Sequence, residues 1–152
     1  MAQIVYGVTG TREGATRAQM ASFLARFWQI TVALEARAHE KWFVHGGCKG
    51  VDVQCHEILR PWGWKFWVLP GPDGPHQTCP PADVVEEPRP YLERNRLIVD
   101  RAHALQVIPK DFQEVLRSGT WATQRYAADV GRKMGIIWPD GRCQDWKGGG
   151  WT

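Results

Sequence analysis

The sequence lacks several features that would assign it to a specialised class of protein. No apolar run approaches the roughly 20 residues that a helix needs to cross a bilayer. The first ten residues contain neither the basic segment nor the cleavage site of a signal peptide. The four cysteines form no CxxC pair, so neither a zinc site nor a disulfide framework is expected. We therefore expect a cytoplasmic protein with no metal, no other cofactor and no membrane contact.

A strong charge of one sign is also absent. Nineteen Lys and Arg against sixteen Asp and Glu give a net charge of +3, and 43% of the 152 residues are hydrophobic. These values are typical of one globular domain and exclude a wholly disordered chain. The mild positive charge permits anionic ligands but does not by itself indicate a nucleic-acid groove.

Apolar periodicity predicts short strands and helices that alternate along the chain. Strands are expected at 3–8, 41–45, 64–69, 104–108 and 134–138, and helices at 16–38, 51–59, 91–102 and 118–130. Short apolar strands that alternate with helices favour a parallel sheet covered on both faces. The expected fold class is α/β, a Rossmann-like three-layer sandwich with a mainly parallel sheet of about five strands.

Two segments differ from this pattern. Residues 70–90 contain seven prolines and almost no periodicity, which indicates a long loop that is either functional or a rigid connection. Residues 142–152 carry three consecutive glycines and two tryptophans, and we expect a loose C-terminal tail unless Trp146 or Trp151 folds back. The chain is thus divided into one domain over 1–141, with the proline-rich insertion inside it, and a tail.

Three glycine-bearing turns follow expected strands and lead towards helices, at 7–12, 45–52 and 117–123. Ligands of parallel α/β sheets bind outside the carboxyl ends of the strands, and helix N-termini there attract phosphate through unpaired N–H groups. The second turn lacks the GKS or GKT of a Walker P-loop, although Lys49 can still meet an anion as a point charge. Each turn can equally be a structural feature, such as a tight turn or a helix cap.

Charged residues near helix starts are the candidate binding side chains. Arg12 and Arg94 are suited to grip a phosphate. Asp52 could accept a hydrogen bond from a ribose hydroxyl. The more common arrangement is structural, in which Asp52 caps the helix and His56 is its partner on the same helix face. Arg94 and Arg96 diverge by about 200° around their helix. We expect one of them to point into the site and the other outward or into an ion pair.

Three segments in a fixed order resemble the SLOG superfamily of Rossmann-like domains, which includes the DNA-processing protein A family and the LONELY GUY phosphoribohydrolases. The segments are HGGCKGVDVQCHEIL, ERNRLIVDRAHALQVIP and SGTWATQRYAADVGRKMGIIWPDG. Within them, GGCKGVDVQCH is similar to the GxARGID…AH segment of the DNA-processing family, and RNRLI and SGTWAT are similar to its RNRII and SGSLITA segments. The likeness covers nearly the whole chain, from Ile4 to Gly141.

The resemblance implies a nucleotide or phosphoribose pocket at the C-terminal edge of the sheet. The residues expected around it, from the resemblance and from the turns, are Gly10, Thr11, Arg12, Gly46, Gly47, Lys49, Asp52, Arg94, Arg96, Ser118, Gly119, Thr120 and Trp121. The glycines and hydroxyls would supply donors, and Trp121 would flank the base. Replacing Arg94 by Ala is expected to weaken ligand binding without unfolding the domain.

The chain departs from the phosphoribohydrolase pattern at one position. Those enzymes carry PGGxGTxxE, and Thr123 stands where the catalytic glutamate would be. A threonine cannot act as that carboxylate. Hydrolysis would therefore require another acidic residue in the pocket, such as Asp52, Glu93 or Glu114, and the catalytic residues stay unassigned.

The function that these observations favour is binding of a nucleotide-derived small molecule, a nucleoside phosphate or an ADP-ribose-type signal, by a sensor or sequestering protein. The alternative is a nucleotide N-glycosidase of the phosphoribohydrolase type. A second alternative is binding of single-stranded DNA, which needs a continuous basic path with exposed aromatics. The resemblance also implies a homodimer or tetramer, for which the helix at 16–38 offers an apolar face, although that helix could simply cover the sheet.

Overall fold

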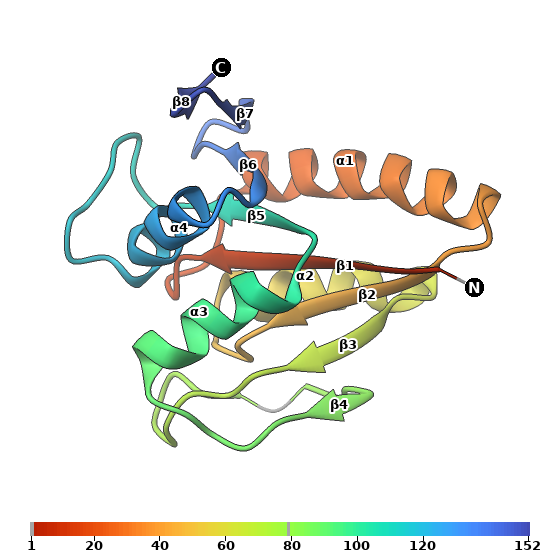
Figure 1. Ribbon diagram of the computed structural model, residues 1–152, viewed down its shortest axis with the longest axis horizontal. Helices are drawn as coiled ribbons and strands as arrows, with labels where there is room; N and C mark the ends of the chain where they lie inside the picture. Colours follow the sequence, from red (N-terminus) through yellow and green to blue (C-terminus); the bar gives the residue numbers. More distant parts are fainter. Residues whose placement is uncertain (1, 79) are drawn as a thin grey trace.

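The computed structural model describes residues 2–78 and 80–152. At its centre lies one eight-stranded sheet (Figure 1). The strand order is β4-β3-β2-β1-β5-β6-β7-β8. The five central strands, which are parallel to one another, are β1 (Gln3–Gly10), β2 (Glu40–His45), β3 (Lys65–Val68), β5 (Ala104–Ile108) and β6 (Lys133–Ile137). All five were expected from their apolar runs, and the α/β class with a mainly parallel sheet is confirmed.

Three further strands widen the sheet beyond the five that were expected. β4 (Val84–Val85) lies inside the proline-rich stretch and pairs with β3 in parallel. At the other edge, β7 (Cys143–Lys147) and β8 (Gly150–Trp151) pair in antiparallel fashion. The expectation of a loose tail is therefore wrong. Trp146 and Trp151 fold back against the core, because burial of their large apolar surfaces offsets the cost of ordering the glycine-rich turn.

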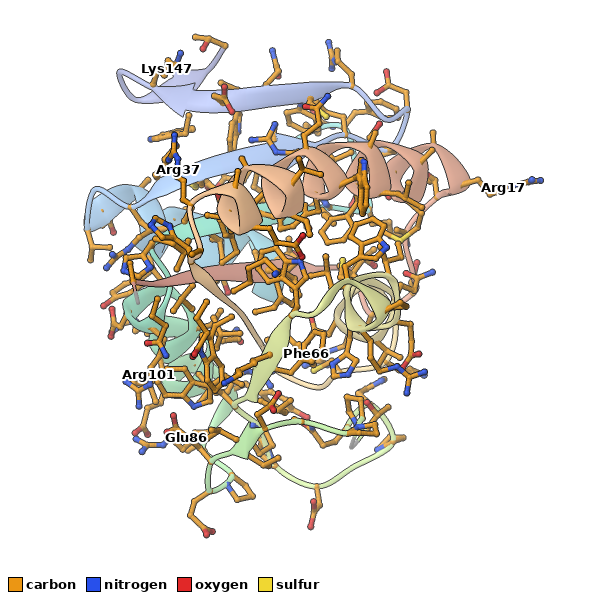
Figure 2. The ribbon with its side chains drawn as sticks, turned by 90° about the vertical axis from the view of Figure 1, so that its right-hand side faces the viewer. Arg17, Arg37, Phe66, Glu86, Arg101 and Lys147 are labelled. Carbon is orange, nitrogen blue, oxygen red and sulfur yellow. The ribbon has the colours of Figure 1, made fainter. Side chains whose placement is uncertain are left out.

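Helices cover both faces of the sheet and complete three layers (Figures 1 and 2). On one face lie α1 (Arg17–Ala36) and α2 (Val51–Leu59), which continues into the short 3-10 helix η1 (Arg60–Trp62). On the other face lie α3 (Tyr91–Arg101) and α4 (Gly119–Asp129). No helix of the described residues is long and apolar enough to cross a membrane.

A different kind of core lies under each pair of helices. Aromatic rings dominate beneath α1 and α2, where Phe23 and Phe27 stack at 4.2 Å between ring centroids and both meet Phe43 of β2. Branched aliphatic residues dominate beneath α3 and α4, together with the buried Trp121. Burial of these side chains supplies most of the driving force for folding.

The start of α1 is tied to the carboxyl ends of the strands. Thr16 and Gln19 form the capping box that the sequence predicts, in which each side chain accepts a hydrogen bond from the other residue's N–H. The buried Gln19 amide also donates to the carbonyls of Pro109 and Ile137, just beyond β5 and within β6. These bonds fix the loops that leave the sheet at this edge.

Candidate functional site

A cavity of about 490 Å³ opens at the carboxyl end of the sheet, between the ends of β1 and β5 and the starts of α3 and α4. Its volume falls in the range of small-molecule sites. The predicted site residues that line it are Gly10, Thr11, Arg12, Asp52, Arg94, Ser118, Gly119, Thr120 and Trp121. Four others, Gly46, Gly47, Lys49 and Arg96, are not part of its lining. The fold thus brings together residues from all three expected turns and from α3.

The N-terminus of α4 forms one wall of the cavity. Ser118 is the N-cap, and its hydroxyl accepts a hydrogen bond from the N–H of Trp121. The N–H groups of Gly119 and Thr120 belong to the first turn, where a helix offers them no partner. A Cβ on residue 119 would meet only Asn95 Nδ2, at 3.8 Å. A ligand atom can therefore approach these amides closely, at the positive end of the helix dipole.

Two arginines flank the ring of Tyr91 at the first turn of α3. The guanidinium carbon of Arg12 lies 4.8 Å from the ring centroid, and that of Arg94 lies 5.4 Å from it. Both distances are within the range of cation–π attraction. The side chain of Arg12 is exposed whereas that of Arg94 is buried, so the two cations differ in their availability to a ligand.

Arg94 donates most of its hydrogen bonds to other groups of the protein. Its Nη1 donates to the carbonyls of Gly46 and Leu69, and its Nε donates to Asn95 Oδ1. Its Nη2 lies 3.5 Å from Cys48 Sγ. Removal of this side chain would leave buried carbonyls without donors, which is destabilising. We therefore expect Arg94→Ala to lower stability, in contrast to the expectation from sequence that it affects binding alone.

Asp52 lies in the first turn of α2 and is buried at the base of the cavity. Its Oδ2 accepts hydrogen bonds from the N–H groups of Gly46 and Cys48, both at 3.1 Å. Burial raises the pKa of the Asp52 carboxyl, and the nearby Arg94 and the two amides partly offset that rise. Burial likewise raises the pKa of the Cys48 thiol. The carboxylate thus holds the preceding loop in place and borders the cavity as well.

The loop between β2 and α2 serves the packing of Arg94. A Cβ on Gly46 would lie 2.3 Å from Arg94 Nη1, and Gly47 has a φ of 68°. The N–H of Gly46 binds Asp52, and that of Gly47 binds His45 Nδ1. The two glycines were predicted to donate to a ligand, but their N–H groups are already engaged. The neighbouring Lys49 is exposed outside the cavity lining.

Arg96 lies apart from Arg94, as the divergence of about 200° around the helix predicts. Its guanidinium carbon lies 5.2 Å from the ring centroid of Tyr126 on α4. Arg94 is the member of the pair that points towards the cavity, and Arg96 contacts the neighbouring helix instead.

The proline-rich stretch clamps the loop between β2 and α2. Gln77 Nε2 donates to the carbonyls of Gly46 and Gly47, and both the N–H and the hydroxyl of Thr78 donate to the carbonyl of Gly47. Further along, Glu86 binds Arg101 of α3 through two hydrogen bonds of 3.1 Å (Figure 2). None of the described residues between 70 and 90 lines the cavity. The contacts favour a rigid connection over a functional loop.

Only one of the three carboxylates considered as substitutes for the family's glutamate borders the cavity. Thr123 is buried, and its hydroxyl donates to the carbonyl of Gly119 inside α4. Glu93 and Glu114 form ion pairs with arginines outside the cavity lining. That leaves Asp52. Among the described residues, no group of three or more His, Cys, Asp or Glu is placed to hold a metal ion.

Several lining residues were not singled out from the sequence. They are chiefly Tyr91, Asn95, Lys110, Asp111 and Arg117. Asn95 is adjacent in sequence to Arg94, and Arg117 is adjacent to Ser118, so both could have been predicted as site residues from their neighbours. Lys110 and Asp111 could also have been predicted, because they follow β5 and the residues after a strand of a parallel sheet lie at the edge where ligands bind.

Comparisons with known proteins identify the fold. No family model and no curated protein matches the chain. Among solved structures, the molybdenum cofactor binding protein from the phototrophic bacterium Rippkaea orientalis is similar, with a TM-score of 0.68 and 14% identity over 91% of this chain and 78% of that one. The structural genomics target TM1055 has a TM-score of 0.59 and 15% identity over 88% and 72%.

DNA-processing protein A is similar in two bacteria. The protein from Streptococcus pneumoniae has a TM-score of 0.58 and 20% identity over 86% of this chain and 49% of that one. The single-stranded DNA-binding protein from Helicobacter pylori has a TM-score of 0.56 and 17% identity over 86% and 63%. The chain therefore spans about half to two thirds of these proteins. Its fold is the SLOG-type fold that its three motif segments predict.

Proposed function

We propose that the cavity binds a small molecule that carries phosphate, of the nucleoside phosphate or ADP-ribose type, with a phosphate seated at the start of α4. The observation that carries the proposal is the open first turn of α4 inside a cavity that arginines also line. Free N–H groups, a positive helix end and guanidinium groups together form a site for a phosphate.

Two arginines are the best candidates for direct contact with the anion. Arg12 and Arg117 both line the cavity and are exposed. Lys110 also lines it, but its Nζ lies 2.8 Å from Glu13 Oε2 in an exposed ion pair. Arg94 is buried and committed to carbonyls, so we assign it to positioning the loop and Asp52. Arg12 and Arg117 would then neutralise the ligand.

We assign contact with a base to the loop between β5 and α4. The predicted partner, Trp121, is almost fully buried and packs against Trp138 with ring centroids 6.0 Å apart. It therefore supplies cavity wall and has no free face for stacking. The loop projects beyond the carboxyl ends of the strands (Figure 1) and carries Phe112, which is 57% exposed beside the cavity-lining Lys110 and Asp111. An exposed ring next to a phosphate site is suited to stack on a base.

The similar proteins fit this choice in part. One is named for binding the molybdenum cofactor, and another is named for binding single-stranded DNA. We favour a small molecule because the lining residues converge on one cavity of about 490 Å³. We also place the protein in the cytoplasm, where nucleotides are abundant and its thiols stay reduced.

Calorimetric titration with AMP, ADP and ADP-ribose tests the proposal. Arg117→Ala should weaken binding about tenfold, since one charge-assisted hydrogen bond contributes roughly 1.4 kcal/mol. The matched control is Arg37→Ala, at the far end of α1 (Figure 2), which should bind as the wild type does. Equal affinity of wild type and Arg117→Ala for every ligand that binds would refute the assignment.

A second candidate function is hydrolysis of an N-glycosidic bond, and the observation that favours it is Asp52. A buried carboxyl with a raised pKa, placed in a cavity, is a candidate for acid or base chemistry. Asp52→Asn keeps an oxygen for the two amides of the loop. If Asp52 is catalytic, this variant should form no free base while still binding the nucleotide. If the protein only binds, loss of the negative charge should tighten binding of the anion.

A further inference from the structure

A second cavity, of about 360 Å³, lies between α1 and the first three residues of both β5 and β6. It is therefore at the opposite end of these strands from the cavity described above, and the two cavities share no lining residue. Small residues leave this space open, with Ala104 and Gly135 on the side of the sheet and Ala33 on the side of α1. The volume is again in the range of small-molecule sites.

The register of the strands places polar side chains around this patch of the sheet. Gln106 of β5 pairs with Gly135 of β6. In the row before it, Ala104 lies between Tyr6 of β1 and Lys133 of β6. Side chains two residues apart along a strand share a face of the sheet. The two rows therefore frame one surface, with small residues at its centre and polar ones around it.

The guanidinium of Arg26 extends from α1 over Gly135. A Cβ on residue 135 would lie 3.0 Å from Arg26 Nη2 and 3.5 Å from Asp145 Oδ1. Arg26 and Asp145 form a partly exposed ion pair of 3.4 Å, and such a pair uses few of the donors of an arginine. Lys133 also lines the cavity and forms no ion pair with a carboxylate of the described residues. Two cations against one carboxylate favour an anionic ligand.

Two polar groups of the second cavity lack a partner within the described part of the chain. Gln106 is only 3% exposed, and its Nε2 donates to the carbonyl of Gly135 at 3.1 Å. Because a carbonyl can only accept, this bond fixes the orientation of the amide and leaves Oε1 without a donor. The Tyr6 hydroxyl has no partner either, and burial raises the pKa of Tyr6, so the hydroxyl stays protonated and can donate. A buried acceptor without a donor is costly, and a ligand in the cavity can supply the donor.

We propose that the second cavity binds a small carboxylic acid that has an apolar body and a hydroxyl group. Its carboxylate binds Arg26 and Lys133 by charge-assisted hydrogen bonds. Its hydroxyl donates to Gln106 Oε1 and accepts from the Tyr6 hydroxyl, since a hydroxyl group can do both. Its apolar body packs against Ile30 of α1, which also lines the cavity. A hydroxylated aromatic carboxylate combines these three features.

Titration of the isotope-labelled full chain with 4-hydroxybenzoate at pH 7, followed by NMR, tests the site and its position. The probe should shift the backbone amide of Gly135 and the side-chain amide of Gln106, with a Kd on the order of 1 mM for so small a ligand. Benzoate lacks the hydroxyl and 4-hydroxybenzyl alcohol lacks the carboxylate, so each should bind about tenfold more weakly. No saturable shift at about ten times the expected Kd, or equal binding of benzoate, would overturn the proposal.

Variants assign the charges that hold the probe. Arg26→Gln should weaken its binding about tenfold and Lys133→Gln about threefold. Lys147→Gln is the matched control, because Lys147 is exposed on the neighbouring strand β7 but does not line the cavity, and it should bind as the wild type does. Arg117→Ala should also keep wild-type affinity for the probe, which separates this site from the proposed nucleotide site. The spectrum of each variant shows whether it is folded. Wild-type affinity in both Arg26→Gln and Lys133→Gln, or probe shifts centred on Gly119, would overturn the proposal.

Discussion

Lowering the pH below 6.5 should destabilise this protein through a buried pair of histidines. His45 Nδ1 accepts the N–H of Gly47 at 2.9 Å, so the proton of the neutral ring sits on Nε2. That nitrogen lies 2.9 Å from His56 Nδ1, which must accept the proton and is therefore unprotonated. Both rings are fully buried. A proton added to His45 Nδ1 would face the N–H of Gly47, and a proton added to His56 Nδ1 would face the Nε2–H of His45.

The size of the effect follows from the pKa of His45. Burial, together with repulsion from His56 and Arg94, lowers it from 6.5 to about 3. Below pH 6.5, His45 therefore takes up a proton in the unfolded chain but not in the folded protein. The free energy of unfolding falls as the pH falls. The slope is about 1.4 kcal/mol per pH unit between pH 6.5 and 3. Burial also lowers the pKa of His56, which adds to the slope in the same sense.

Urea unfolding at pH 7.5, 6.5, 5.5 and 5.0 measures this slope. From pH 6.5 to 5.0, His45 alone should account for a loss of roughly 2 kcal/mol. His45→Gln can still donate to His56 but cannot take up a proton, so its stability should be lower at pH 7.5 and fall less steeply. Arg37, which is exposed at the end of α1 and does not titrate in this pH range, supplies the control. Arg37→Ala should keep the wild-type slope. The same slope in wild type and His45→Gln would refute the reasoning.

Two further predictions concern the loop and the cavity. Gly46→Ala should lower the free energy of unfolding by roughly 3 kcal/mol, as measured by chemical denaturation. The new Cβ would collide with Arg94 Nη1 and break the hydrogen bonds from Nη1 to buried carbonyls. The control is Gly74→Ala, which should change stability little because nothing lies within 4 Å of the new Cβ. Phe112→Ala should weaken nucleotide binding about tenfold, by the loss of one stacking contact, and leave affinity for inorganic phosphate unchanged, as calorimetry would show. A Phe112→Ala variant that binds nucleotide as tightly as wild type would remove the ring from the site.

Local sequence patterns predicted the parts of the fold that depend on local physics. The five parallel strands follow from short apolar runs, and the start of α1 follows from the capping box of Thr16 and Gln19. The separation of Arg94 from Arg96 follows from helix geometry alone. The edge strands did not follow, because β7 and β8 form where Trp146 and Trp151 meet distant parts of the core, and no local pattern encodes those contacts.

The sequence predicted the position of the cavity, but it predicted the roles of the surrounding residues only in part. Parallel strands bring their connections to one edge, so Arg12, Asp52 and Ser118 meet there as expected. A glycine-rich turn does not reveal where its N–H groups point, and those of Gly46 and Gly47 proved to be engaged by Asp52 and His45. These are tertiary contacts, and they decide which donors stay free for a ligand.

One measurement tests most directly whether the cavity holds a phosphate-bearing small molecule. The purified protein is incubated with a panel of nucleoside phosphates and ADP-ribose-type dinucleotides and then ultrafiltered, and mass spectrometry reads the filtrate and the fraction released by heat. We expect the wild type to retain at least one ligand intact and Arg117→Ala to retain less of it. Retention of none of them, with no product formed, would contradict the proposed function, and release of a free base with a ribose phosphate would show hydrolysis instead of simple binding.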